Sequence, residues 1–79
     1  MSNKERYNKI IAEVFELGDG PIDENMEREK TEKWDSLVHL TLVSAIEDEF
    51  DIMLDTEDIL GMNSYSRGLE IINSYCAEV

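Results

Sequence analysis

The sequence has few of the residues that cross-link or stiffen a small fold. Its 79 residues include one cysteine, Cys76, and one proline, Pro21. A lone cysteine excludes an internal disulfide, and the lack of a CxxC motif or a Cys/His cluster excludes the usual structural metal sites. A chain of this size hides only about 60% of the surface that the unfolded chain exposes, so its core is small and must be held by packing alone.

Long apolar runs are also missing. No stretch approaches the roughly 20 apolar residues of a membrane-spanning helix. The N-terminal segment, MSNKERYNKIIAEVF, lacks the uninterrupted apolar stretch and the small-residue cleavage site of a secretory signal. We therefore expect a soluble, cytoplasmic protein that does not insert into membranes.

Basic residues are scarce, above all in the second half of the chain. Seven Lys and Arg against 19 Asp and Glu give a formal net charge of −12. Residues 35–79 contain ten acids and a single base, Arg67, while residues 47–58 contain seven acids and no base. Such a charge repels nucleic acid and anionic membranes and attracts basic protein surfaces. The pattern predicts protein partners with positive patches; the alternative is a surface that only confers solubility.

Apolar residues recur at helical spacing in the N-terminal segment. Ser2 and Glu5 form the capping-box pattern S-x-x-E, and apolar side chains follow at three- and four-residue intervals. The pattern predicts a helix over residues 3–17, ended by Gly18. Residues 18–35 alternate charges without an apolar period and predict a long ordered loop with room for a short helical turn.

Three further helices are expected in the second half. Asp35 can cap a helix over residues 36–50, which carries an apolar stripe. One further turn is expected over 56–60, and Ser64 can cap a last helix over 65–77. Strand-type alternation is not sustained anywhere in the sequence.

The predicted fold class is all-α. Residues 1–79 are expected to form one domain, a small antiparallel bundle of three main helices plus one short helix, with a long loop between the first two. An uninterrupted coiled coil is excluded because glycines and a proline break any heptad.

The motif WDSLVHL, residues 34–40, stands where the long loop meets the second helix. It contains the triplet Asp35-Ser36-Leu37, and an acidic run, IEDEFDI, follows one helix later. Together with the amphipathic first helix, the long loop and the short helix before the last one, these features resemble the acyl carrier protein family over nearly the whole chain. That family carries its modified serine in an Asp-Ser-Leu triplet at the start of its second helix.

The resemblance implies a carrier without catalytic residues of its own. A phosphopantetheinyl transferase would attach 4'-phosphopantetheine from coenzyme A to Ser36, and the thiol of this arm would hold an acyl group as a thioester. The other implied partners are an acyl-loading ligase or acyltransferase and downstream acyl-processing enzymes with basic surfaces, all meeting a monomeric carrier. The residues expected at these contacts are Asp35, Leu37, Val38, Glu47, Asp48 and Asp51.

Elementary physical chemistry favours an anion at Ser36 independently of the resemblance. With Asp35 as the cap, Ser36 is the first helical residue and is exposed where the helix leaves the loop. Unpaired N–H groups and the positive end of the helix dipole favour an anion there by roughly 0.3–1 kcal/mol. The alternative is that Asp35 and Ser36 form only a capping pair, as such residues usually do.

Four residues bear on the pathway. Fatty-acid-synthesis carriers often have acids in the first turns of the second helix, where this chain has Val38, His39 and Thr41, so we expect a less charged recognition surface there. Trp34 is typical of specialised stand-alone carriers, or it only packs over the core. We expect a specialised fatty-acid, lipid or polyketide-type pathway. An aminoacyl or peptidyl carrier is the alternative, although the GGxS signature of peptidyl carriers is absent.

An attached acyl chain of medium length is expected to lie between the helices over 36–50, 56–60 and 65–77. Inward-facing apolar residues, a flexible methionine and the small Gly68 would leave room for it. The expected lining residues are Val43, Ile46, Ile59, Met62 and Leu69. The alternative is that these residues are ordinary core.

Other function classes fit the sequence less well. Ser36 and His39 share a helical face and suggest a serine hydrolase, but a bundle this small can scarcely build the oxyanion hole and water-excluding cleft that hydrolysis needs. Calcium-loop windows that begin at Asp19 or Asp51 lack the required glycine and glutamate, so no metal site is predicted. An acidic helical interaction module without a prosthetic group is a further alternative.

Overall fold

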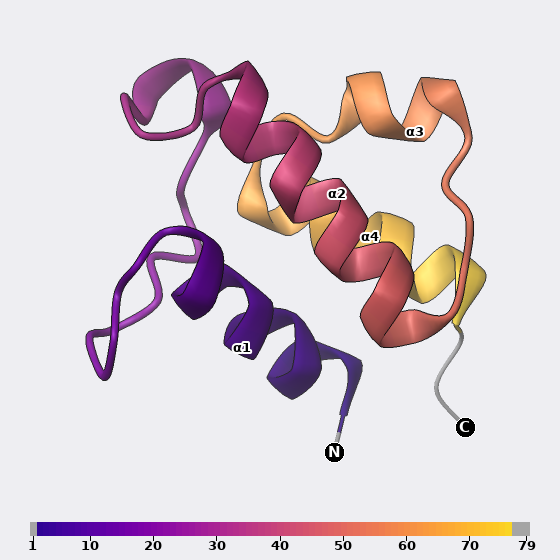
Figure 1. The fold of residues 1–79 in the computed structure, drawn as a ribbon, viewed down its shortest axis with the longest axis horizontal. Coiled ribbons are helices and arrows are strands. Elements are labelled where there is room, and N and C mark those ends of the chain that lie inside the picture. Colours follow the sequence, from indigo (N-terminus) through magenta and orange to yellow (C-terminus); the bar gives the residue numbers. More distant parts are fainter. Residues whose placement is uncertain (1, 77–79) are drawn as a thin grey trace.

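The computed structural model of the chain describes residues 2–76, which form four α-helices (Figure 1). A short 3₁₀ helix, Arg28–Lys30, lies in the first loop, and the described residues contain an isolated β-bridge but no β-strand. The predicted all-α class is therefore confirmed. The helices are α1 Asn3–Val14, α2 Ser36–Phe50, α3 Thr56–Gly61 and α4 Tyr65–Tyr75.

The long helices are arranged around α1, which packs against both α2 and α4. Figure 1 shows α1 running antiparallel to α2, while α4 passes behind α2 in the same general direction as α2. The short α3 connects the end of α2 to the start of α4. It runs back against the direction of α2, so that α4 can again run in the direction of α2. The predicted antiparallel packing thus holds for α1 against its two neighbours but is wrong for α2 against α4.

α1 begins where the sequence predicts. The Ser2 hydroxyl accepts a hydrogen bond from the Glu5 N–H at 3.1 Å, and the Glu5 carboxylate accepts one from the Ser2 N–H at 3.2 Å. These two bonds complete the capping box. The hydrogen bond from the Ser2 N–H also lowers the pKa of Glu5, because it stabilises the carboxylate.

The end of α1 differs from the prediction, since the helix stops at Val14 and not at residue 17. Glu16 has φ 55° and so lies in the left-handed region. The Leu17 N–H bonds to the Ala12 carbonyl at 2.9 Å, and the Glu16 N–H bonds to the Glu13 carbonyl at 3.3 Å. This is the Schellman stop, with a glutamate at the position that glycine usually occupies.

α2 has the predicted bounds. The Asp35 carboxylate caps it by accepting a hydrogen bond from the Val38 N–H at 2.9 Å. At the other end Asp51 has φ 54°, and the Ile52 N–H bonds to the Glu47 carbonyl at 3.1 Å. Aspartate is among the few residues that adopt this conformation readily. The buried stripe of α2 consists of His39, Leu42, Val43, Ile46 and Phe50.

Two tyrosines join α1 to α4 in the core. Tyr7 is fully buried, and its hydroxyl donates a hydrogen bond to the Tyr65 carbonyl at 2.9 Å, while the two rings lie 4.9 Å apart between centroids. Burial raises the pKa of Tyr7 well above its ordinary value. Gly68 faces the Tyr7 ring, and its lack of a side chain allows this close approach.

The first loop is ordered because it pairs with the start of α4. The Arg28 N–H bonds to the Asn63 carbonyl at 2.8 Å, and the Tyr65 N–H bonds to the Met26 carbonyl at 2.9 Å. Trp34 is buried with only 2% of its surface exposed. These contacts hold the loop in place up to Trp34, directly before the start of α2.

The described part of the last helix ends at Tyr75. Its Ser64 cap is confirmed, because the Ser64 hydroxyl accepts a hydrogen bond from the Arg67 N–H at 3.1 Å. The predicted extension to residue 77 lies outside the described residues. Within residues 2–76, no helix combines the length and the apolar character needed to cross a membrane.

Candidate functional site

The start of α2 presents Ser36 to solvent. Ser36 is exposed and is the first residue of the helix, directly after the Asp35 cap. The Asp35 carboxylate uses one oxygen for the Val38 N–H, whereas the N–H groups of Ser36 and Leu37 lie in the first turn, where the helix offers them no acceptor. An anionic group on the Ser36 hydroxyl would meet these free donors and the positive end of the helix dipole. The predicted geometry of the serine is therefore present.

A cavity of about 340 Å³ lies beside this helix start. The end of α1 forms one wall, and the residues around Asp35 form the other. Lys33 contributes a cation to the lining and Glu16 an acid. The lining residues are Val14, Phe15, Glu16, Lys33, Asp35 and Val38.

Near the start of α2, the side chains of Trp34 and His39 form a hydrogen-bonded pair. The Trp34 Nε1–H donates a hydrogen bond to His39 Nδ1 at 3.0 Å, and His39 Nε2 lies 2.7 Å from the Ile59 carbonyl oxygen. Because indole can only donate, Nδ1 must be the acceptor, so Nε2 carries the hydrogen and donates to Ile59. The Phe15 ring meets Trp34 edge-on with centroids 5.5 Å apart.

This arrangement corrects one expectation about His39 and adds to the case against a serine hydrolase. The ring is buried with 4% exposure, so it is not part of an exposed recognition surface. Both ring nitrogens are engaged by Trp34 and Ile59, so neither is free to accept the proton of Ser36. The spacing of three residues that suggested a hydrolase instead places His39 on the core stripe of α2.

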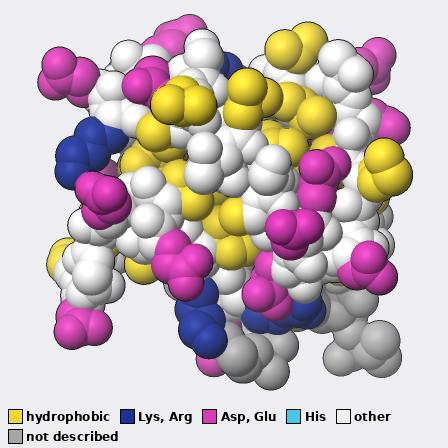
Figure 2. Space-filling view, viewed as in Figure 1, with side chains coloured by type: hydrophobic (Ala, Val, Ile, Leu, Met, Phe, Trp, Pro, Cys, Tyr) yellow, Lys and Arg dark blue, Asp and Glu magenta, His cyan; other side chains and the backbone are white. Residues whose placement is uncertain are grey.

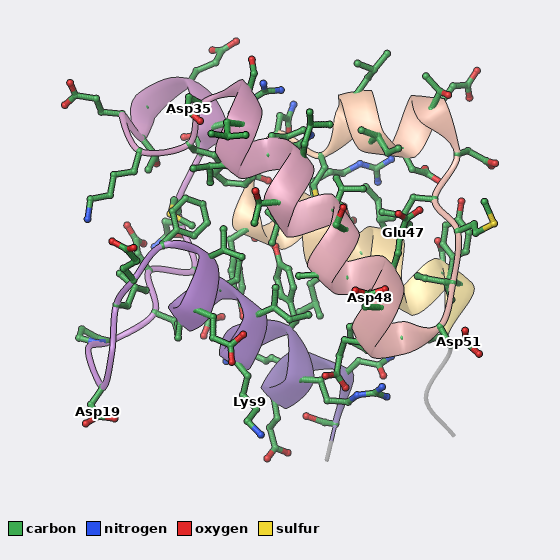
Figure 3. All side chains as sticks on the ribbon, in the orientation of Figure 1. Lys9, Asp19, Asp35, Glu47, Asp48 and Asp51 are labelled. Atoms are coloured by element: carbon green, nitrogen blue, oxygen red, sulfur yellow. The ribbon has the colours of Figure 1, made fainter. Side chains whose placement is uncertain are left out.

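The predicted acidic contact residues differ in their surroundings (Figure 3). Asp48 is exposed and Asp51 is exposed at the left-handed end of α2. Glu47 is half-buried, and its carboxylate accepts a hydrogen bond from the Leu54 N–H at 2.9 Å. Glu47 thus holds the α2–α3 connection, and only Asp48 and Asp51 are free to meet a partner without loss of such a bond.

Exposed apolar side chains accompany the acids, and of these only Leu37 was among the predicted contact residues. Leu37 is 73% exposed, Leu40 60% and Leu60 72%. Figure 2 shows hydrophobic side chains gathered on the face that carries α2 and α3, with acidic groups around them. The signal was available, since Leu37 and Leu40 fall outside the buried stripe of α2. Met53, in the α2–α3 connection, is 85% exposed.

The five residues expected to line an acyl pocket all lie in or against the core. Val43, Ile46 and Met62 are buried, whereas Ile59 and Leu69 are partly buried and pack against the core. The cavity beside Asp35 is not lined by any of these five. A second cavity, of about 410 Å³, lies between the first loop and the start of α4 and is not lined by them either.

The described residues do not contain a group of three or more His, Cys, Asp or Glu side chains placed to hold a metal ion. The second cavity nevertheless carries three acids, Glu24, Glu27 and Glu29. Two of them have cationic partners, since Glu24 pairs with Lys4 at 3.0 Å and Glu27 with Lys30 at 3.3 Å.

Comparison with known proteins leaves the family of the chain open. A scan against protein-family models, a search of curated proteins and a search of solved structures each gave no match. What bears on the function of the chain is therefore its sequence motif and the geometry at Ser36.

Proposed function

We propose that the chain is an acyl carrier protein whose arm is attached at Ser36. The observation that carries the proposal is an exposed serine at the first position of α2, directly after a capping aspartate and within the triplet Asp35-Ser36-Leu37. The all-α fold, the long ordered loop before this serine and the short helix before the last one support it. The proposed cargo is an acyl group, and the proposed pathway is a specialised fatty-acid, lipid or polyketide-type one.

In the proposed modification, the chain itself contributes only the Ser36 hydroxyl and the N–H groups at the start of α2. In the transferase, the Ser36 hydroxyl attacks the pyrophosphate of coenzyme A, a serine O–P bond forms, and the bond to the adenosine bisphosphate leaving group breaks. The hydroxyl proton passes to a base outside this chain. The free N–H groups at the start of α2 then stabilise the phosphodiester. The arm supplies a thiol that holds the acyl group as a thioester.

The face of α2 and α3 is the proposed docking surface for the transferase and for acyl-handling enzymes. Leu37, Leu40 and Leu60 provide apolar contact, and Asp48 and Glu57 provide charge on the same pair of helices. A partner that fits this surface has an apolar patch with basic residues around it. Charges of this kind act mainly on the rate of encounter.

Intact mass spectrometry tests the proposal. The unmodified chain is incubated with coenzyme A, magnesium and a broad-specificity phosphopantetheinyl transferase, and we expect the addition of a single phosphopantetheine. Ser36→Ala should abolish the addition. Ser44→Ala is the matched control, because Ser44 is exposed on the same helix, and it should leave the addition unchanged.

Two variants of the cap separate recognition from folding. Asp35→Ser keeps a capping oxygen but removes the charge, whereas Asp35→Ala removes both and should lower the stability by about 1 kcal/mol. Slower modification of Asp35→Ser at unchanged stability would assign the carboxylate to transferase recognition. Addition at another serine, or no addition by several transferases, would refute the carrier and leave an acidic interaction module.

A further inference from the structure

The cavity beside the start of α2 combines apolar and charged side chains. Its apolar lining comes from Val14 and Phe15 at the end of α1 and from Val38 on α2. Phe15 is buried, whereas Val14 and Val38 are half-buried and so offer apolar surface to the cavity. The volume of about 340 Å³ falls within the range of small-molecule sites, which is roughly 300–1,000 Å³. The cavity is therefore large enough for a thin, partly apolar ligand.

One wall of the cavity contains a strained residue. Glu16 lines the cavity and has φ 55°, a conformation that glycine would adopt without strain. The turn that it makes leaves Val14, Phe15 and Glu16 together along this wall. Strained backbone of this kind is found above all at ligand-binding and other functional sites. The strain at the end of α1 thus falls on the cavity.

Lys33 brings a cation to the same cavity. Its side chain is exposed, and it has no ion-pair partner among residues 2–76, where the ion pairs use other bases. An ammonium group that is free in this way can bind a phosphate oxygen as a point charge. A free cation beside an apolar surface suits a ligand that carries both an anion and an apolar part.

The 4'-phosphopantetheine arm has this combination of groups. It begins with a phosphodiester anion, followed by two geminal methyl groups, two amides and the terminal thiol. Ser36 directly follows Asp35, which lines the cavity where the first loop meets α2 (Figure 3). A short flexible tether gives an effective concentration on the order of millimolar, so a contact with a dissociation constant of about 1 mM is enough for substantial occupancy.

We infer that this cavity is a resting site for the arm on Ser36. The geminal methyl groups lie against the apolar side chains of the lining, and Lys33 attracts the phosphodiester. The inference deepens the proposed function and rests on it, because it needs an arm at Ser36.

The resting site is separate from the proposed docking surface. Leu37, Leu40 and Leu60 do not line the cavity, so an arm at rest leaves this surface open to a partner. The hold on the arm is weak, because the cavity is open to solvent and the carboxylates of Glu16 and Asp35 repel the phosphodiester. A partner enzyme can therefore withdraw the arm easily.

NMR on the chain that carries phosphopantetheine tests the resting site. Nuclear Overhauser effects from the geminal methyl protons of the arm should reach the methyl groups of Val14 and Val38. These methyl signals should also shift relative to those of the unmodified chain. Contacts of the arm with Leu37, Leu40 or Leu60 alone would overturn the inference, as would an arm without any such contact to the chain.

Two pairs of variants sharpen the experiment. Lys33→Gln removes the cation and should weaken the arm's contacts with Val14 at least twofold. Lys30→Gln is its control, because Lys30 is exposed in the same loop but does not line the cavity, and it should leave them unchanged. Val14→Thr replaces a methyl group with a hydroxyl and should weaken the contacts with Val38, whereas Leu40→Ala should not. Equal effects within either pair would contradict the resting site, and circular dichroism melts check that each variant is folded.

Free 4'-phosphopantetheine separates this inference from the proposed function. Added at about 10 mM to the unmodified chain, above the expected dissociation constant, it should shift the methyl signals of Val14 and Val38. A chain that no transferase modifies but that binds the free compound in this way refutes the carrier and keeps the cavity as a phosphopantetheine site. A chain that is modified at Ser36 but shows neither result refutes the resting site and keeps the carrier.

Discussion

At the scale of single residues, Gly68 is where the packing of α4 against α1 is least tolerant. A methyl carbon built there would overlap the Tyr7 hydroxyl and lie 3.0 Å from its Cζ atom. Tyr7 is fully buried and tied to the Tyr65 carbonyl, so it cannot move aside without losing that bond. Gly61 offers a contrast, since no atom lies within 4 Å of a methyl group built there.

We therefore predict opposite effects for the same substitution at these two glycines. Gly68→Ala should lower the free energy of unfolding by about 1–3 kcal/mol through overpacking. Gly61→Ala should raise it by roughly 0.5 kcal/mol, because alanine favours the helical conformation of α3. Urea denaturation followed by circular dichroism measures both. Equal effects of the two variants would contradict the close approach of Tyr7 to Gly68.

The roles of Trp34 and His39 show the limit of sequence reasoning at this scale. The motif that contains them was recognised, and a core position for Trp34 was one of the two interpretations. Their hydrogen bond was not foreseen, and neither was the bond from His39 to Ile59. Such pairing depends on the path of the first loop and on the placement of α3. Neither is encoded in helical periodicity.

At the scale of elements, the ends of helices are less predictable than their starts. The side-chain oxygens of Ser2, Asp35 and Ser64 each accept a hydrogen bond from a backbone N–H, as predicted. Capping at an N-terminus is predictable because it depends on neighbouring residues only. The predicted end of α1 was wrong because the observed end depends on the left-handed conformation of Glu16, and glutamate does not favour this conformation. Gly18 was the more obvious candidate.

The conformation of Glu16 leads to a second prediction. Glu16→Gly should stabilise the chain by roughly 0.5–1 kcal/mol, because relief of left-handed strain outweighs the greater freedom of glycine in the unfolded state. Glu13→Gly is the control, since Glu13 is exposed inside α1, and it should destabilise by a similar amount. Thermal melts of the two variants should move in opposite directions, and two downward shifts would contradict the Schellman stop.

At the scale of the whole molecule, charge is concentrated on one part of the chain. Residues 35–79 hold ten acids and one base, and this part includes α2 and α3. The sequence predicted this concentration, but it did not separate acids free to meet a partner from those with structural duties. Glu47 accepts a hydrogen bond from the Leu54 N–H, so its substitution would also disturb the fold. The Asp51 carboxylate is free to meet a partner, but its backbone is left-handed at the end of α2, so most substitutions there would add strain.

The third prediction uses two exposed acids without such duties. The pair Asp48→Lys and Glu57→Lys should slow association with a phosphopantetheinyl transferase about three- to tenfold in low salt, because steering is lost. Stopped-flow binding should show the difference shrinking as salt rises, since screening acts over about 8 Å at physiological ionic strength. The control pair Asp19→Lys and Glu32→Lys makes the same change of net charge elsewhere on the chain. If this pair slowed association equally, the effect would come from overall charge and not from the surface of α2 and α3.

The burial of Trp34 has a consequence for how this protein can be observed. Trp34 is the only tryptophan in the chain, and it lies against Phe15 and His39, at the junction of α1, the first loop and α2. Indole fluorescence shifts to longer wavelengths when water reaches the ring, so the emission of the chain reports on one defined place. A binding or unfolding event that alters the start of α2 is visible without any label, while events confined to the far end of the helices leave the spectrum unchanged.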